Sequence, residues 1–147
     1  MLILSRDRDY PDLLAPLRGK RVAVWTCNTC ARLCGDVGGE DSAERLAAGL
    51  RKDGIDVVRV RSVSASCLGS KVASAAKDLL SDDPDVILSL TCSIGAGCIG
   101  RCTGKDVINP VTTYGHGYLS EDGTPVLSRE DGDIPVGELT SRCSPYL

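Results

Sequence analysis

Residues 21–26 read Arg21-Val22-Ala23-Val24-Trp25-Thr26, an almost continuous run of apolar and β-branched side chains. A strand with one face in water alternates between polar and apolar residues, and this run does not. The run is typical of a strand that is covered on both faces, as the strands of parallel sheets are. It therefore predicts a central strand of a parallel sheet.

Further helices and strands are predicted in alternation along the chain. The pattern gives a helix over residues 40–52, a strand over 56–63, a helix over 68–80 and a strand over 85–91. In the first of these helices, apolar residues recur at helical spacing from Ala43 to Leu50. Such alternation is typical of an α/β fold with right-handed crossovers between parallel strands.

The chain after residue 91 has a weaker pattern. Residues 92–104 carry four glycines and predict no more than one turn of helix. Residues 107–113, interrupted by Pro110, predict a short fourth strand. From about Leu119 the chain is rich in turn-forming and charged residues, which predicts a hairpin or an irregular arm.

Length and composition fit a single globular unit. A chain of 147 residues corresponds to one domain, and we expect an α/β domain over residues 1–118 with a C-terminal arm of the same domain over residues 119–147. The 42% of apolar and 25% of charged residues exclude a disordered or collagen-like chain. The net charge of −3 argues against nucleic acid as a partner.

Eight cysteines against a single histidine, His116, are the unusual feature of the composition. The first residues show no signal-peptide pattern, and no apolar run is long enough for membrane insertion. We therefore expect a cytoplasmic chain, in a compartment where structural disulfides are rare. In that setting the cysteines indicate metal ligands or redox thiols.

Five cysteines fall where the predicted strands end. Cys27 directly follows the first strand, Cys67 lies just past the second, and Cys92 directly follows the third. Cys30 and Cys34 lie in the loop that leaves the first strand. Because the carboxyl ends of parallel strands meet at one edge, where open α/β sheets bind their ligands, we expect these five thiols to converge.

The spacing from Cys27 to Cys34 is C-x2-C-x3-C. It can supply three ligands to one small metal centre, and a neighbouring loop would supply the fourth, as Cys67 or Cys92. Four thiolates suit a [4Fe–4S] cluster or a structural zinc ion. The iron–sulfur interpretation is favoured because structural zinc sites usually pair two C-x2-C motifs, and this chain has one.

The remaining cysteines and the C-x2-C pair leave other interpretations open. Cys98 and Cys102 could form a second centre with Cys143, or they could be small buried hydrophobic residues. The pair Cys27 and Cys30 also resembles a dithiol redox motif, although such motifs usually open the following helix directly.

Catalytic groups are scarce in the sequence. We find no arrangement of Ser, His and Asp and no pair of carboxylates that can be assembled into an active site, and His116 lies in a glycine-rich turn typical of a structural residue. The chain is thus expected to be a non-catalytic electron-transfer subunit of an oxidoreductase complex, and to dock on a flavoprotein.

A resemblance to a known family rests on four stretches. They are Val22-Ala23-Val24-Trp25-Thr26-Cys27-Asn28-Thr29-Cys30-Ala31-Arg32-Leu33-Cys34 with Gly38-Gly39-Glu40, then Cys67, then Leu90-Thr91-Cys92-Ser93-Ile94-Gly95, and Asn109-Pro110-Val111-Thr112-Thr113. Together they resemble the small cysteine-rich (MetV-type) subunit of bacterial methylenetetrahydrofolate reductases, which accompanies a flavin-bearing catalytic subunit in anaerobes.

The resemblance implies both a fold and a function. The fold would be a Rossmann/flavodoxin-like three-layer α/β domain, and the function would be electron transfer from an iron–sulfur cluster to a flavoprotein partner in one-carbon metabolism. Other iron–sulfur proteins are possible further partners. The cysteines that match the family pattern are Cys27, Cys30, Cys34, Cys67 and Cys92. The alternative function is a zinc-stabilised structural or interaction module of such a complex.

Overall fold

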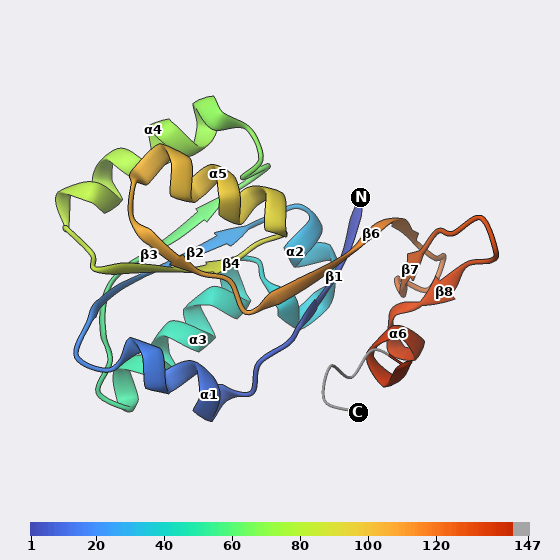
Figure 1. Cartoon of the computed structure of the whole chain (residues 1–147), viewed down its shortest axis with the longest axis horizontal. Helices are drawn as coiled ribbons and strands as arrows, with labels where there is room; N and C mark the ends of the chain where they lie inside the picture. Colours follow the sequence, from blue (N-terminus) through green and yellow to red (C-terminus); the bar gives the residue numbers. More distant parts are fainter. Residues whose placement is uncertain (143–147) are drawn as a thin grey trace.

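Two sheets organise the chain, a parallel one between two layers of helices and an antiparallel one beside it (Figure 1). The structure is a computed structural model and describes residues 1–142. None of the helices described is long and apolar enough for a membrane crossing.

The parallel sheet has four strands in the order β3-β2-β4-β5. They are β3 (Asp56–Val63), β2 (Arg21–Cys27), β4 (Val86–Leu90) and β5 (Asp106–Ile108). Only the first residue of β2 is exposed, and all of β4 is buried. The prediction of a central strand covered on both faces is thus confirmed, because β2 lies between β3 and β4.

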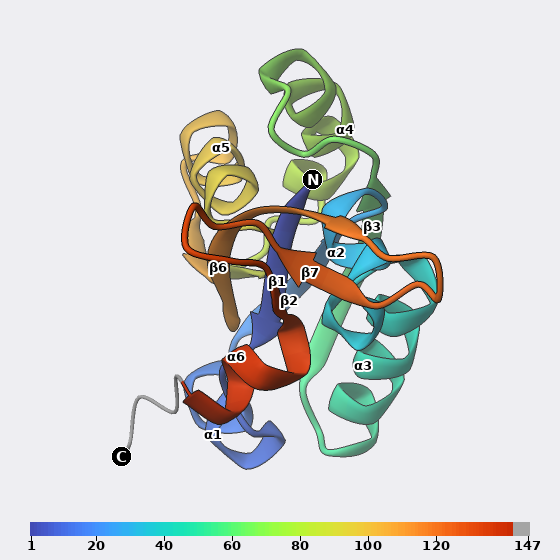
Figure 2. The same cartoon turned by 90° about the vertical axis from the view of Figure 1, so that its right-hand side faces the viewer.

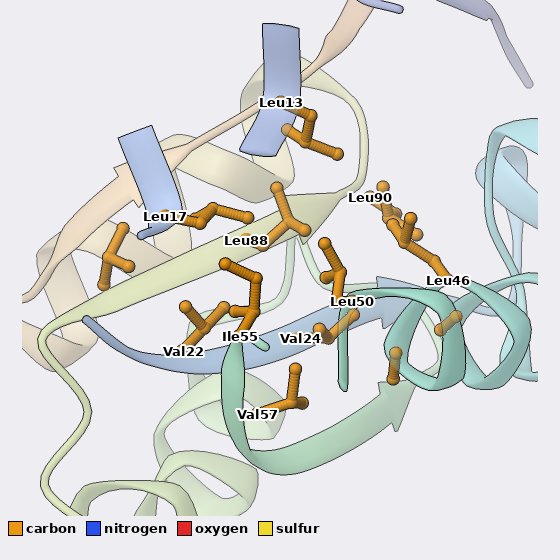
Figure 3. Packing of buried hydrophobic residues seen from close by; sticks show 13 residues of the cluster. Leu13, Leu17, Val22, Val24, Leu46, Leu50, Ile55, Val57, Leu88 and Leu90 are labelled. Carbon is orange, nitrogen blue, oxygen red and sulfur yellow. The ribbon is translucent and has the colours of Figure 1, made fainter. Parts of the chain in front are cut away.

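Helices cover both faces of this sheet. One face carries α1 (Tyr10–Leu14), the short 3₁₀ helix η1 (Ala15–Leu17) and α3 (Glu40–Lys52). Figure 3 shows their side chains Leu13, Leu17, Leu46 and Leu50 packed on those of the strands. The other face carries α4 (Gly69–Ser81) and α5 (Ser93–Thr103), with Trp25, Leu79 and Ile99 in its core.

The antiparallel sheet has the order β1-β6-β7-β8. Its strands are β1 (Leu2–Arg6), β6 (Val111–Leu119), β7 (Pro125–Leu127) and β8 (Ile134–Pro135). The last helix, α6 (Val136–Arg142), lies with β7 on the side that faces the viewer in Figure 2. Leu139 of α6 is buried against Ile3 and Leu127, so the arm is anchored on the first strand of the chain.

Four predicted elements are confirmed within one or two residues, namely α3, β3, α4 and β4. The prediction for residues 92–104 is wrong, because α5 is a helix of 11 residues. Its glycines fit close packing: a Cβ at Gly95 would lie 3.1 Å from the side chain of Thr91, and one at Gly100 would lie 3.7 Å from Val107. Packing on the sheet thus outweighs the low helix propensity of glycine.

The single fourth strand predicted over residues 107–113 is two strands. Pro110 separates β5, which ends the parallel sheet, from β6, which belongs to the antiparallel one. Proline has no backbone N–H to donate, so a strand seldom continues through it. The parallel sheet still has the four strands expected, and the fold is mixed α/β with a second, antiparallel sheet.

Candidate cysteine site

The carboxyl edge of the parallel sheet brings three cysteine-bearing loops together. Cys27 is the last residue of β2 and lies opposite Val63, the last residue of β3. The N–H of Asn28 donates to the carbonyl of Val63 at 3.2 Å, which holds the two strand ends side by side. Cys67 follows β3, and Cys92 follows β4 as the N-cap of α5.

Four of these cysteines line one small cavity. Its volume is about 60 Å³, and the thiols around it are those of Cys27, Cys30, Cys67 and Cys92. Most other lining groups are apolar, including Leu2 of β1 and Ile94 of α5. The structure therefore brings together four of the five cysteines that the sequence placed at this edge.

Cys27 has two hydroxyl-bearing residues, Thr29 and Ser66, as hydrogen-bond partners. Its Sγ lies 2.8 Å from Oγ1 of Thr29. Burial raises the pKa of Cys27, but hydrogen bonds from Thr29 and Ser66 oppose this effect and leave the pKa below its ordinary value. These hydrogen bonds therefore favour the deprotonated form of Cys27, which is the form that binds a metal.

Backbone N–H groups donate to two other sulfurs. Cys30 opens the short helix α2 (Cys30–Leu33), and its Sγ accepts a hydrogen bond of 3.4 Å from the N–H of Leu2. Sγ of Cys92 accepts from the N–H of Gly95 at 3.3 Å. Burial raises the pKa of Cys92, and the neighbouring thiols Cys30 and Cys27 raise it further.

Cys34 points away from the four-cysteine cavity. The backbone of Leu2 lies between Cys34 and Cys30. Its N–H donates to Sγ of Cys30, and its carbonyl accepts a hydrogen bond of 3.7 Å from Sγ of Cys34. The thiol lines a different cavity of about 240 Å³ with Leu4, Val37 and Val136. Burial raises the pKa of Cys34. The C-x2-C-x3-C motif is therefore divided, with its first two thiols in one cavity and its third in another.

Cys98 and Cys102 lie on α5 and do not line this cavity. Cys98 is buried in the core between α4, α5 and the sheet. Burial raises its pKa, as does a hydrogen bond with Cys102, and Cys98 is close enough to Cys67 for that thiol to raise the pKa as well. Cys102 also donates to the carbonyl of Gly69 at 3.9 Å. Cys98 thus fits the interpretation as a small buried hydrophobic residue, whereas Cys143 lies outside the described residues.

The seven described cysteines are all free thiols. Across residues 1–142, no three His, Cys, Asp or Glu side chains are grouped as they would be around a single metal ion. The four thiols line their cavity from three loops instead of forming such a compact set.

The sequence did not reveal three residues of this site. Ser66 is buried beside Cys67 and accepts a hydrogen bond from the indole of Trp25. Thr29 lies inside the C-x2-C motif, where its hydroxyl gave no separate signal. Leu2 comes from a strand whose partner β6 begins more than a hundred residues later, and no local pattern reveals such a pairing.

A larger cleft of about 540 Å³ lies beside α2, at the start of α3. Its lining mixes both signs of charge, with the side chains of Arg32, Arg45, Glu40 and Asp41. The two carboxylates at the helix start oppose the binding of an anion there.

No protein-family model matches this chain, and no curated protein matches it either. The resemblance to the cysteine-rich reductase subunit therefore stays a prediction, and the arguments about function rest on the residues themselves.

Proposed function

We propose that this protein is an electron-transfer subunit that holds a [4Fe–4S] cluster. Cys27, Cys30, Cys67 and Cys92 would be the four ligands. The observation that carries the proposal is that these thiols, from three separate loops, line a single apolar cavity at the carboxyl edge of a parallel sheet. Four cysteine thiolates are the usual ligand set of such a cluster.

The surroundings of the four thiols suit this role. The lowered pKa of Cys27 favours the thiolate that binds iron. The N–H groups of Leu2 and Gly95 donate to two of the sulfurs. Such hydrogen bonds stabilise negative charge on a cluster and so tune its reduction potential.

The proposed ligand set leaves out Cys34, the third cysteine of the C-x2-C-x3-C motif. Cys34 completes C-x2-C-x3-C along the chain, but its thiol faces the carbonyl of Leu2 and a second cavity. The proposal therefore takes both Cys67 and Cys92 as ligands, and leaves Cys34 out. This choice makes Cys34 a natural control for the other four.

The partner would be a flavoprotein of one-carbon metabolism, similar to the catalytic subunit of methylenetetrahydrofolate reductase. The cluster would receive an electron from a further iron–sulfur protein and pass it to the flavin. This part of the proposal rests on the family resemblance and on the scarcity of catalytic groups. A cytoplasmic location is also proposed, because free thiols persist in a reducing compartment.

We further propose that the domain belongs to the Rossmann/flavodoxin-like class. Numbered along the chain, its parallel strands stand in the order second, first, third, fourth across the sheet. A flavodoxin-like sheet begins with the same order. Helices on both faces agree with the three-layer arrangement.

Metal analysis of protein purified without oxygen tests the proposal. We expect about four irons and four sulfides per chain, with broad visible absorption that fades on reduction. Single substitutions Cys27→Ser, Cys30→Ser, Cys67→Ser and Cys92→Ser should each lower the iron content sharply. Cys34→Ser should retain it.

Two outcomes would replace the proposal with another function. Stoichiometric zinc without iron would indicate a zinc-stabilised interaction module. Absence of any metal, together with disulfide exchange that is lost in Cys30→Ser, would indicate a dithiol oxidoreductase.

A further inference from the structure

The two most exposed large hydrophobic side chains of the described residues belong to the segments that carry Cys67 and Cys92. Leu68 is 49% exposed and Ile94 is 53% exposed. Ile94 lines the cavity itself, and Leu68 directly follows Cys67, another lining residue. The helices that begin there, α4 and α5, pack side by side (Figure 1). Large apolar side chains that are left exposed beside a candidate site are suited to contact with a partner.

The charges around this apolar pair differ from those of the whole chain. The chain has 20 acidic residues against 17 basic ones. Yet the three segments that carry the cavity cysteines, residues 27–35, 64–77 and 89–105, contain no Asp or Glu. All of their charged residues are basic, so the cavity loops on the side of α4 and α5 carry no carboxylate, whereas Glu40 and Asp41 lie at the start of α3 on the other face of the sheet.

Two basic side chains belong to the same two helices as these apolar residues. Lys71 lies three residues after Leu68 and is exposed. The guanidinium of Arg101 extends back along α5, since a Cβ placed at Gly97 would lie 3.2 Å from its Nη1. It therefore reaches toward the turn that carries Ile94. We call Leu68, Ile94, Lys71 and Arg101 the docking face.

We propose that the docking face binds a redox partner protein whose flavin edge is exposed within an apolar patch ringed by carboxylates. This inference rests on the proposed function and adds the chemistry of the partner. Opposite charges at the rim would steer and orient the partner, and the apolar centre would exclude water between flavin and cavity. The partner would then meet the thiols at their most exposed member, Cys67.

A second copy of this chain fits the docking face less well. A symmetric dimer would bring two copies of the same face together. The basic side chains of one copy would then face the basic side chains of the other, and like charges at an interface are unfavourable. A membrane surface would not need a thiol-lined cavity directly behind the apolar side chains.

Binding of a purified flavodoxin, chosen for carboxylates around its exposed flavin edge, tests the inference. Calorimetry should show an affinity that falls as salt is added, because salt screens exposed charges. The double substitution Lys71→Glu with Arg101→Glu should weaken binding by about tenfold or more. Lys20→Glu makes the same kind of charge change at the opposite edge of the sheet, just before β2, and should have little effect.

A second pair of variants tests the apolar centre. Leu68→Ser with Ile94→Ser should also weaken binding by about tenfold. Tyr118→Ser should not, because this exposed aromatic side chain lies on β6, where its hydroxyl donates to Asp133. Circular dichroism and thermal unfolding of each variant establish that the fold is kept.

Several outcomes would overturn the inference. The first is no measurable binding of flavodoxin. The second is flavodoxin binding that Lys20→Glu weakens as much as the docking-face variants do. The third is self-association, or binding to anionic vesicles, that depends on the docking face while flavodoxin does not bind. Iron content, measured on the same samples, separates the two proposals. Protein with iron but without docking contradicts only this inference, and protein without iron contradicts only the proposed function.

Discussion

The indole Nε1 of Trp25 donates a hydrogen bond of 3.0 Å to Oγ of Ser66. Trp25 is fully buried in β2, and Ser66 lies in the loop after β3, next to Cys67. The hydroxyl of Ser66 in turn donates to the carbonyl of Val63 at 3.2 Å. One side chain thus ties the core of the sheet to the loop that brings Cys67 to the cavity.

Ser66→Ala should destabilise the protein by about 1–3 kcal/mol, because it leaves the buried indole N–H of Trp25 without a partner. The measurement is urea unfolding of the metal-free protein. Ser64→Ala, two residues earlier and exposed, is the matched control and should change little. Equal stability of the two variants would mean that the Trp25 hydrogen bond does not hold this loop.

Two glycines should respond to alanine in opposite directions. A Cβ at Gly38 would lie 2.7 Å from Cβ of Ala31 and 2.8 Å from the carbonyl of Leu90, so Gly38→Ala should cost about 1–3 kcal/mol of stability. A Cβ at Gly49, inside α3, would meet only the Tyr10 hydroxyl at 3.7 Å. Gly49→Ala should therefore stabilise by about 0.5–1 kcal/mol. Thermal unfolding measures both, and a stable Gly38→Ala would contradict the close approach at this loop.

Cys98 and Cys102 should matter for stability and not for iron. Cys98→Ser places a hydroxyl in the core between α4 and α5 and should cost about 1–3 kcal/mol. Cys102→Ser, at a half-buried position, should cost less. Iron content should equal that of the unsubstituted protein in both. A loss of iron in both variants would instead support a second centre on α5.

If the proposed cluster is present, its removal should leave the α/β core folded. The core between α1, α3 and the sheet contains no thiol, and the core on the other face contains only Cys98 among its buried residues. Far-ultraviolet circular dichroism after chelation should therefore keep its helical signal while the melting temperature falls. Complete unfolding by a chelator is expected of a zinc-stabilised module, and it would contradict the prediction that the core stays folded without the cluster.

Stability should fall in alkaline solution because of Tyr10. Burial, followed by the hydrogen bond of 2.5 Å from its phenol to Asp53, raises the pKa of Tyr10 to about 12. An unfolded tyrosine titrates at about pH 10. Between these two values the unfolded chain loses a proton that the folded chain keeps, so the contribution is full below pH 10 and is lost toward pH 12.

Tyr10→Phe should remove this part of the pH dependence, as measured by denaturant unfolding at successive pH values. Asp53→Asn is the companion variant, since it removes the charge that opposes ionisation and should lower the Tyr10 pKa in an ultraviolet titration of tyrosinate. An unchanged titration in Asp53→Asn would show that the carboxylate is not the partner.

The local pattern predicted the parallel part of the fold well. β2 and β4 are apolar throughout, and α3 and α4 keep an apolar face at helical spacing, so each segment reveals its own structure. The position of Cys27 and Cys92 followed directly, because both lie at ends of buried strands. Parallel topology alone then brings their loops to one edge.

The missed features depend on packing contacts, which the residue pattern of a segment does not reveal. α5 forms despite its glycines, because Gly95 and Gly100 let the helix approach Thr91 and Val107. β1 was not predicted, because its strand character comes from pairing with β6 across most of the chain. The orientation of Cys34 followed from this same pairing, since Leu2 of β1 enters between Cys30 and Cys34. The spacing of the cysteines in the motif could not reveal that a residue of another strand lies between two of them.

The pairing of β1 with β6 also sets the order of assembly during protein synthesis. Leu2 lies opposite His116 in this pair, so the first strand has no partner until residues 111–119 have left the ribosome. Closing so long a loop costs chain entropy before the contact can form. The wall that Leu2 gives to the cysteine cavity, and its N–H bond to Cys30, are thus completed only once β6 has been made. A cluster would accordingly be enclosed on this side only after the strands of the parallel sheet, which precede β6 in the chain, have been made.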